Sequence, residues 1–183
     1  MELKILFGKY KGKKITYPKD FHARPTLARS RDVLFNWQQS FKGLRCLDLF
    51  AGTGIIGLEA LSLGAEFVDF IDLNRTNAHL LKQTLKKMSL SQRSRVTCTD
   101  AFHWLNKNRD VYDFIFIDPP FDKDLHFKIL AKLTTSASIS SKTIVFVESP
   151  NDIEFPCEWE QLKEKKIGKV KIYLIKKAEV ESE

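Results

Sequence analysis

From residue 44 onward, short apolar runs alternate with segments in which apolar residues recur every three or four positions. Runs of the first kind predict buried strands, and segments of the second kind predict helices with one apolar face. Strands that alternate with helices are typical of a parallel sheet covered by helices on both faces. We therefore predict an α/β domain over residues 44–178.

The predicted sheet contains seven strands. Five of them lie at Arg45–Leu49, Phe67–Asp72, Val96–Thr99, Phe114–Ile117 and Thr143–Glu148, and Phe114–Ile117 is expected to be buried. Helices are predicted near residues 55–63, 74–88, 101–107 and 124–136. The last two strands, Glu158–Lys166 and Lys169–Lys177, form an antiparallel edge hairpin that turns at Gly168. Residues 179–183 are expected to be a flexible tail.

The first 43 residues have a different pattern and are treated as an extension. Residues 3–7 and 13–17 are short β-type runs, and the glycine-bounded segment between them predicts a hairpin with a basic tip. A helix is predicted from the N-cap Thr26 to about Phe41. Its apolar stripe packs on the core, and we expect Arg29 and Arg31 to project away from that stripe.

Positive charge is concentrated in this extension. Residues 1–45 contain eleven Lys or Arg and three Asp or Glu, a balance of plus eight, whereas the whole chain carries plus seven. Such localisation favours a nucleic-acid-binding arm, although a solvated lysine-rich face would give the same count. The candidate nucleic-acid contacts are Lys9, Lys11, Lys13, Arg24, Arg29 and Arg31.

Other features of the composition exclude several classes of protein. There is no run of about 18 uncharged apolar residues and no signal-peptide pattern, so we expect a cytoplasmic protein. Cys46, Cys98 and Cys157 are odd in number and far apart, which argues against disulfides. Neither the cysteines nor the four histidines have the spacing of metal ligands, so no metal is predicted.

A glycine-rich loop follows the first strand of the domain. Gly52, Gly54 and Gly57 satisfy the spacing G-x-G-x-x-G, which is also found in nicotinamide-binding enzymes. Asp48 would end the strand beside this loop, where its negative charge suits an ammonium group and repels a pyrophosphate. This favours S-adenosylmethionine over a dinucleotide.

Acidic residues follow the next three strands as well. Asp72 is placed to accept hydrogen bonds from ribose hydroxyls, and Asp100 could bond the adenine amine. The alternative for Asp100, and for Asn74, is a helix N-cap. Asp118 ends the strand Phe114–Ile117 and is followed by two prolines and Phe121, so a carboxylate, a rigid turn and an aromatic ring succeed one another.

With these residues the chain resembles the class I S-adenosylmethionine-dependent methyltransferases, and among them the RsmD-type 16S ribosomal RNA guanine-N2 methyltransferases. The resemblance covers nearly the whole length. It rests on Arg24-Pro-Thr26, Arg29, Arg31 and Leu34-Phe-Asn-Trp37, on Leu47 to Gly54, on Gly57 to Leu61, and on Asp118-Pro-Pro-Phe121.

The resemblance implies a Rossmann-like fold and a role for each matching residue. Asp118, Pro119, Pro120 and Phe121 correspond to the catalytic tetrad. The implied cofactor-binding residues are Asp48, Phe50, Ala51, Gly52, Thr53, Gly54, Asp72, Leu73, Asp100 and Ala101. The chain departs from the family where Asp72 replaces a frequent glutamate and Asn74 replaces an aspartate.

The implied function is methylation of the exocyclic N2 amine of a guanine in 16S ribosomal RNA, within a small ribosomal subunit or an assembly intermediate, by a monomeric enzyme. Three alternatives are retained. The same tetrad serves adenine-N6 methyltransferases of DNA or RNA. A dehydrogenase would use the glycine loop but not Asp118 or the basic arm. A non-enzymatic RNA-binding module would keep the arm and a vestigial cofactor site.

Overall fold

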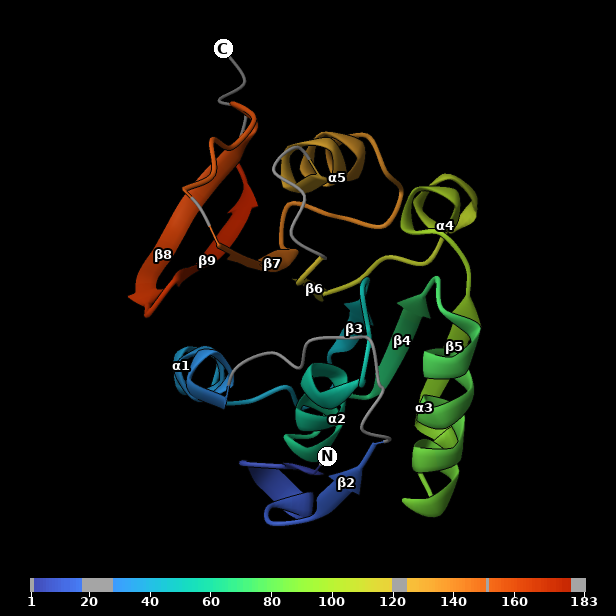
Figure 1. Cartoon of the computed structure of the whole chain (residues 1–183). Helices are drawn as coiled ribbons and strands as arrows, with labels where there is room; N and C mark the ends of the chain where they lie inside the picture. Colours follow the sequence, from blue (N-terminus) through green and yellow to red (C-terminus); the bar gives the residue numbers. More distant parts are fainter. Residues whose placement is uncertain (1, 18–27, 120–124, 151, 179–183) are drawn as a thin grey trace.

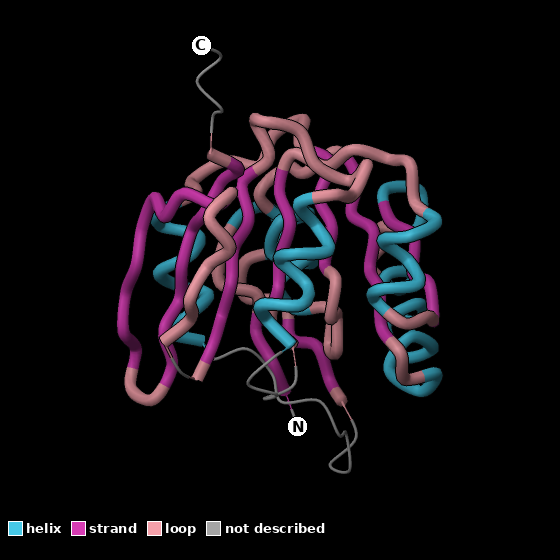
Figure 2. Tube along the Cα trace, turned by 90° about the horizontal axis from the view of Figure 1, so that it is seen from above, coloured by secondary structure: helices cyan, strands magenta, loops and turns pink. Residues whose placement is uncertain are grey.

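The computed structural model describes residues 2–17, 28–119, 125–150 and 152–178. A mostly parallel sheet lies at the centre, with helices on both of its faces (Figures 1 and 2). The strands are β1 (Glu2–Lys4), β2 (Lys14–Thr16), β3 (Arg45–Asp48), β4 (Phe67–Asp72), β5 (Ser94–Cys98), β6 (Phe114–Ile117), β7 (Ile144–Ser149), β8 (Trp159–Ile167) and β9 (Val170–Lys177). The helices are α1 (Ala28–Trp37), α2 (Ile55–Ser62), α3 (Arg75–Lys87), α4 (Ala101–Lys107) and α5 (Leu125–Thr134), with 3-10 turns η1 (Gly8–Tyr10) and η2 (Ser91–Arg93).

The seven-stranded sheet has the order β5-β4-β3-β6-β7-β9-β8. Strands β3 to β7 are parallel, and β9 runs antiparallel between β7 and β8. The predicted sheet and its C-terminal edge hairpin are thereby confirmed. The chain builds β3, β4 and β5 in one direction and then crosses to β6 on the other side of β3. Ligands bind at such a reversal, beyond the carboxyl ends of the strands.

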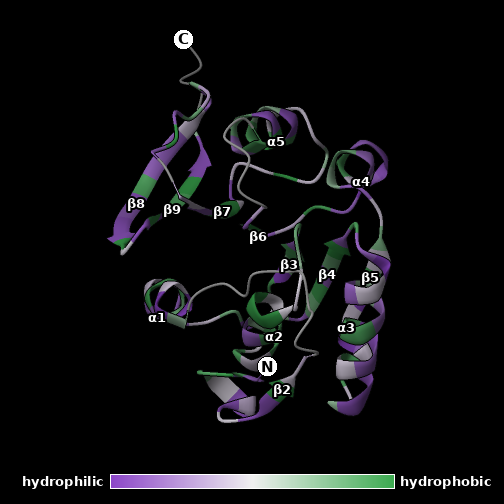
Figure 3. Cartoon of the chain, in the orientation of Figure 1, coloured by the Kyte–Doolittle hydropathy of each residue, from purple (hydrophilic) through white to green (hydrophobic). Residues whose placement is uncertain are grey.

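The core consists of two apolar clusters, one on each face of the sheet. The first joins α1, α2 and α3 to side chains such as Phe114 and Phe116, and the second joins α4 and α5 to Ile115 and Ile117. Successive residues of β6 thus enter opposite clusters, as the two-residue period of a strand requires. All four residues of β6 are buried, which explains why its sequence is apolar throughout. Figure 3 shows the central strands as hydrophobic and most of β8 as hydrophilic.

Helix α3 shows how local sequence sets an element. The side chain of Asn74 accepts hydrogen bonds from the backbone amides of Thr76 and Asn77, which makes it the N-cap, and Lys86 and Lys87 lie in the last turn. Basic residues at a helix C-terminus interact favourably with the helix dipole. The predicted helix at residues 74–88 is therefore confirmed to within one residue at each end.

The helix of the extension is shorter than predicted, because it ends at Trp37 and not near Phe41. Phe41 is fully buried, and its ring centroid lies 5.0 Å from that of Phe114 in an edge-on arrangement. The chain leaves the helix after Trp37 and inserts this ring into the core from a loop. Phe41 was assigned to the apolar stripe of the helix because burial by a loop leaves no periodic pattern.

The hairpin of the extension is confirmed, with shorter strands than predicted. Strands β1 and β2 pair antiparallel through Glu2 to Lys4, and η1 forms the intervening turn. The predicted N-cap Thr26 lies outside the described residues. Among the helices of the described ranges, none is both long and apolar enough to cross a membrane.

Candidate functional site

The carboxyl ends of β3 and β6 form the crevice at the topological reversal. Asp48 is the last residue of β3 and pairs in register with Phe116, while Asp118 follows the end of β6 directly. Asp118 comes two residues after Phe116, the register partner of Asp48. Because side chains alternate between the two faces of a sheet, Asp48 and Asp118 are expected on the same face. The two acids predicted from sequence are therefore brought together at the position where α/β folds bind ligands.

The glycine-rich loop crosses from β3 toward β4 at this edge. The amide of Ala51 donates to the carbonyl oxygen of Ile71 at 2.8 Å, and the amide of Gly52 donates to the carboxylate of Asp72 at 2.6 Å. Gly54 begins α2 with a φ of 73°, and a Cβ there would lie 2.4 Å from a methyl of Leu81. Its left-handed backbone conformation therefore favours glycine, and a larger residue would also have to displace the buried Leu81 side chain.

Asp48 is only 3% exposed, and one carboxylate oxygen accepts a hydrogen bond from the amide of Gly57 at 3.2 Å. The pKa of Asp48 is raised to about 8, mainly by burial. The Gly57 hydrogen bond opposes this rise, and the negative charges of Asp118 and Asp72 contribute to it. A neighbouring cation would stabilise the ionised form of this buried carboxyl group. This fits the ammonium group predicted for it.

Asp72 holds the loop and the next helix together. One oxygen accepts from Gly52, and the other accepts from the amide of Asn74 at 2.7 Å and from the side chain of Asn77 at 3.3 Å. A carboxylate has about four acceptor positions, so the donors in the described part of the chain occupy three and leave roughly one. A hydroxyl could occupy the fourth. The sequence predicted the ribose contact but not this bracing role.

Asp100 caps α4, since its carboxylate accepts a hydrogen bond from the amide of His103 at 3.0 Å. The N-cap alternative considered for Asp100 and Asn74 therefore describes both residues. Asp100 is exposed, and its second oxygen faces no described donor. Nearby, Leu73 is 73% exposed, and Cys98 donates from its sulfur to the Leu73 carbonyl. An exposed leucine beside these polar groups provides an apolar face for a flat ring.

The remaining cofactor candidates lie around this loop. Ala51, Thr53 and Ala101 are buried, whereas Phe50 is half-buried and packs against the cluster on the α4 and α5 face. In the predicted tetrad, Asp118 is half-buried and Pro119 is buried. Pro120 and Phe121 lie outside the described residues.

The extension docks on α2, the helix that begins at the glycine loop. The amides of Leu6 and Phe7 donate to the two oxygens of Glu59 at 2.8 and 3.0 Å. The hydroxyl of Ser62 accepts from the amide of Tyr10 at 2.8 Å. Gly8 has a φ of 73°, and a Cβ there would lie 2.1 Å from the Ser62 carbonyl oxygen. The hairpin therefore lies directly on α2.

A second link joins the extension to the loop itself. The hydroxyl of Tyr17, which is 3% exposed, donates to the carbonyl oxygen of Thr53 at 2.5 Å. Burial raises the pKa of the Tyr17 phenol far above its usual value, so the group remains a donor. Sequence reasoning missed this residue, because the two partners are separated by 36 positions.

Arg31 was predicted to contact RNA, and the structure contradicts this. Its side chain is 2% exposed, and its guanidinium donates to Glu59 at 2.6 Å and to the Lys4 carbonyl at 3.1 Å. Glu59 is fully buried, so Arg31 balances a charge in the core. The sequence did contain a sign of this pair, since Glu59 is an acid in the otherwise apolar first turns of α2.

The other RNA candidates of the extension differ in position. Lys9, Lys11, Lys13 and Arg29 are exposed, whereas Arg24 lies outside the described residues. The ammonium groups of Lys9 and Lys13 lie 5.6 and 5.4 Å from the ring centroid of Tyr10. The tip of the hairpin therefore combines two cations with an aromatic ring.

The sheet order, the glycine loop and the acids at the strand ends together define a class I methyltransferase. The chain belongs to the family described as conserved hypothetical protein 95, whose model matches residues 3–176. It is 33% identical to the ribosomal RNA small subunit methyltransferase D of Buchnera aphidicola from Acyrthosiphon pisum over 93% of this chain and 91% of that protein. It is 30% identical to the Escherichia coli protein of the same name, over 92% and 87% of the two chains. The predicted resemblance to RsmD-type enzymes is confirmed.

Solved structures agree with this assignment. A methyltransferase from Escherichia coli, yhhF, superposes with a TM-score of 0.87 at 28% identity, covering 97% of this chain and 98% of that one. A methylase from Haemophilus influenzae superposes with a TM-score of 0.82 at 31% identity, covering 98% and 100%. The fold of a class I methyltransferase therefore extends over nearly the whole chain.

Proposed function

We propose that this protein transfers a methyl group from S-adenosylmethionine to the exocyclic N2 amine of a guanine in small-subunit ribosomal RNA. The observation that carries the proposal is the pair Asp48 and Asp118 at the reversal between β3 and β6, beside a loop whose backbone favours glycine. The names of the relatives support ribosomal RNA as the substrate. Guanine N2 is the target that the family resemblance implies.

The residues at the crevice fit the proposed cofactor. Asp48 would bind the ammonium group of the cofactor, and the remaining acceptor position of Asp72 would bind a ribose hydroxyl. The second oxygen of Asp100 would accept from the adenine amine, and Leu73 would pack against the adenine ring. Phe50, Ala51, Gly52, Thr53, Gly54 and Ala101 would complete the pocket around these groups. When bound, S-adenosylmethionine supplies an electrophilic methyl group on a sulfonium.

The protein's part in the reaction is to position the amine. The lone pair of an exocyclic amine is delocalised into the base, so the nitrogen is a poor nucleophile. Asp118 accepts one amino hydrogen and the carbonyl of Pro119 accepts the other, which turns the lone pair toward the crevice. Phe121 offers a ring on which the base stacks, a contact worth about 1–3 kcal/mol.

The extension supplies the attraction for RNA. Lys9, Lys11 and Lys13 at the hairpin tip, Arg29 on α1, and Arg24 would bind phosphates, and Tyr10 lies among the first of these. Residues 1–43 would bind RNA, and residues 44–178 would bind the cofactor and perform the transfer. Residues 179–183 would form a tail. The protein would act in the cytoplasm, as a monomer, on a small subunit or its precursor.

The deciding experiment offers the protein labelled S-adenosylmethionine with protein-free 16S RNA, small ribosomal subunits and duplex DNA in parallel, and then identifies the labelled nucleoside. We expect N2-methylguanosine from one of the two RNA substrates. Label in N6-methyladenine would replace the proposed target with the adenine alternative. Absence of label from every substrate, with cofactor bound, would reject the proposed activity.

A further inference from the structure

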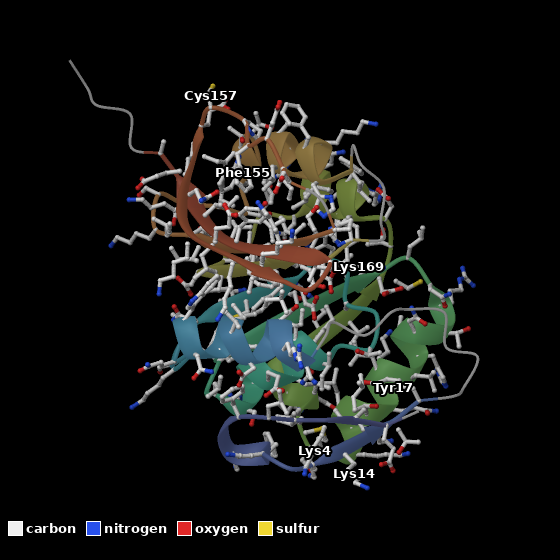
Figure 4. The ribbon with its side chains drawn as sticks, turned by 60° about the vertical axis from the view of Figure 1, so that its left-hand side comes forward. Lys4, Lys14, Tyr17, Phe155, Cys157 and Lys169 are labelled. Atoms are coloured by element: carbon white, nitrogen blue, oxygen red, sulfur yellow. The ribbon has the colours of Figure 1, made fainter. Side chains whose placement is uncertain are left out.

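The hairpin of β8 and β9 turns at the active edge of the sheet. Strand β9 runs antiparallel to β7, with Lys176 opposite Ile144 and Lys171 opposite Ser149. Ser149 ends β7 at the carboxyl edge, so the turn at Gly168 lies at the edge that also carries Asp118. Figure 4 shows Lys169 at this end of the hairpin, above α1.

The acidic residues of β8 form ion pairs with lysines of β9. Glu160 pairs with Lys176 at 3.3 Å, and Glu164 pairs with Lys171 at 2.9 Å. The second half of β8 and the turn after it also carry four exposed lysines, Lys163, Lys165, Lys166 and Lys169. Within the described ranges, none of these lysines forms an ion pair with a carboxylate. This end of the hairpin therefore carries a local excess of positive charge.

These lysines continue the basic surface of the extension. The ammonium of Lys163 lies 5.8 Å from the ring centroid of Trp37, which joins β8 to α1. Helix α1 carries the exposed Arg29 and lies between the N-terminal hairpin and the β8–β9 hairpin in both views of the ribbon (Figures 1 and 4). Basic side chains thus follow one flank of the molecule from the N-terminal hairpin to the active edge.

Lysines on an edge strand also prevent pairing with other sheets, and this is the alternative explanation. A charge at any position along the strand can give protection of that kind, so protection alone does not explain why the lysines cluster at one end. The first part of β8, Trp159 to Leu162, contains no lysine, although Gln161 and Leu162 are exposed. The lysines lie only toward the carboxyl edge, where a substrate would approach.

We infer that Lys163, Lys165, Lys166 and Lys169 form a second surface for the RNA backbone at the active edge, whereas the basic tip of the N-terminal hairpin lies at the far end of α2, beside Ser62. This inference rests on the proposed RNA-directed function. Ammonium groups at a rim bind phosphates without reading sequence, so the surface would fix the orientation of the RNA over Asp118 and leave the choice of base to the crevice. The RNA would be held beside the site by these lysines and farther away by the tip of the N-terminal hairpin.

The test compares two variants with the same change in charge. One carries Lys165→Gln, Lys166→Gln and Lys169→Gln, and the control carries Lys82→Gln, Lys86→Gln and Lys87→Gln on α3, where all three lysines are exposed. Affinity for protein-free 16S RNA is measured by filter binding from about 50 to 250 mM KCl. The logarithm of affinity is plotted against the logarithm of salt concentration.

We expect the hairpin variant to lose about 2 from the slope of this plot and to bind RNA about 10- to 50-fold more weakly near 150 mM salt, because three phosphate contacts are removed. The α3 variant should change affinity less than about 3-fold, and both should bind S-adenosylmethionine like the wild type. Equal losses in the two variants, or an unchanged slope in the hairpin variant, would overturn the inference. Methyl transfer by the wild type, measured separately, decides the proposed function independently.

Discussion

The hydroxyl of Tyr17 donates a 2.5 Å hydrogen bond to the carbonyl oxygen of Thr53, so the basic extension is bonded to the middle of the glycine loop. The amide of the same peptide group, that of Gly54, donates to the Ala51 carbonyl oxygen at 2.6 Å, so Tyr17 and Ala51 together fix the orientation of this peptide. Movement of the hairpin on binding RNA would therefore be transmitted to the loop proposed to hold the cofactor.

Replacing Tyr17 with Phe should weaken cofactor binding. The change leaves a buried carbonyl oxygen without its donor, at a cost of about 1–3 kcal/mol, and frees the loop. We expect the dissociation constant for S-adenosylmethionine, measured by calorimetry, to rise about 5- to 20-fold.

The matched control for this change is Tyr112→Phe. Tyr112 is also fully buried, and its hydroxyl donates to Asp69 at 2.9 Å, but it precedes β6 and so lies at the opposite edge of the sheet. It should lower the free energy of unfolding by a similar amount and leave cofactor affinity unchanged. If both variants weaken the cofactor equally, Tyr17 has no specific link to the site.

Two arginines of α1 should behave in opposite ways. Arg31→Ala leaves Glu59 buried without its cationic partner and should reduce the free energy of unfolding by about 3–5 kcal/mol. Arg29→Ala removes an exposed side chain, so stability should change by less than about 0.5 kcal/mol while RNA affinity falls. Urea denaturation and filter binding of both variants would measure this. A stable Arg31→Ala protein with weak RNA binding would restore the original assignment of Arg31 as an RNA contact.

The raised pKa of Asp48 predicts a dependence of stability on pH in the ligand-free protein. Between about pH 4 and 8 the folded state keeps a proton that the unfolded state has lost, so stability falls as the pH rises through this window. Each pKa unit corresponds to roughly 1.4 kcal/mol, and the total effect at pH 8 is on the order of a few kcal/mol.

Asp48→Asn removes this titration but retains an oxygen that accepts from Gly57. Thermal denaturation at pH 5 and pH 8 should show the variant melting about 5 °C above the wild type at pH 8, with a smaller difference at pH 5. Cofactor affinity should fall at least about 10-fold, since the ammonium group loses its carboxylate. Melting temperatures that change in parallel with pH would show that Asp48 ionises normally.

Asp118 should be essential as an acceptor rather than as a negative charge. Asp118→Ala should lower the rate of methyl transfer by about 10²- to 10³-fold with little change in cofactor affinity, whereas Asp118→Asn, which retains an acceptor oxygen, should keep a measurable fraction of the activity. Single-turnover transfer to the RNA substrate separates the two variants. Wild-type activity in Asp118→Ala would remove Asp118 from the mechanism, and equally low activity in both variants would show that the negative charge itself is needed.

Features encoded by neighbouring residues were predictable. The apolar run of β6 and the acid that follows it, the glycine loop, and the edge hairpin around Gly168 each lie within about ten positions of sequence. Their order then determines the parallel sheet, and the sheet brings Asp48 and Asp118 together. The crevice could therefore be placed before any contact was known.

Features that depend on distant partners were not predictable. Arg31 and Glu59 are 28 positions apart, and a basic residue on a short amphipathic helix has the same pattern whether it faces RNA or a buried acid. The lysines of β8 were hidden in a different way. The net charge of residues 46–183 is minus one. This sum conceals that lysines of β9 pair with the acids of β8, so that the lysines of β8 keep a local excess of positive charge.

The turn at Gly168 has a φ of 61° and open space around its Cβ position, with nothing within 4 Å. The turn joins β8 and β9 at the edge of the sheet where the substrate would bind, and it lies outside the paired part of the two strands. The core therefore does not depend on the length of this turn. Insertions here would lengthen the hairpin over the crevice without altering the sheet. Evolution could thus change which nucleic acid fits the enzyme by editing one turn, while the methyl-transfer machinery stays constant.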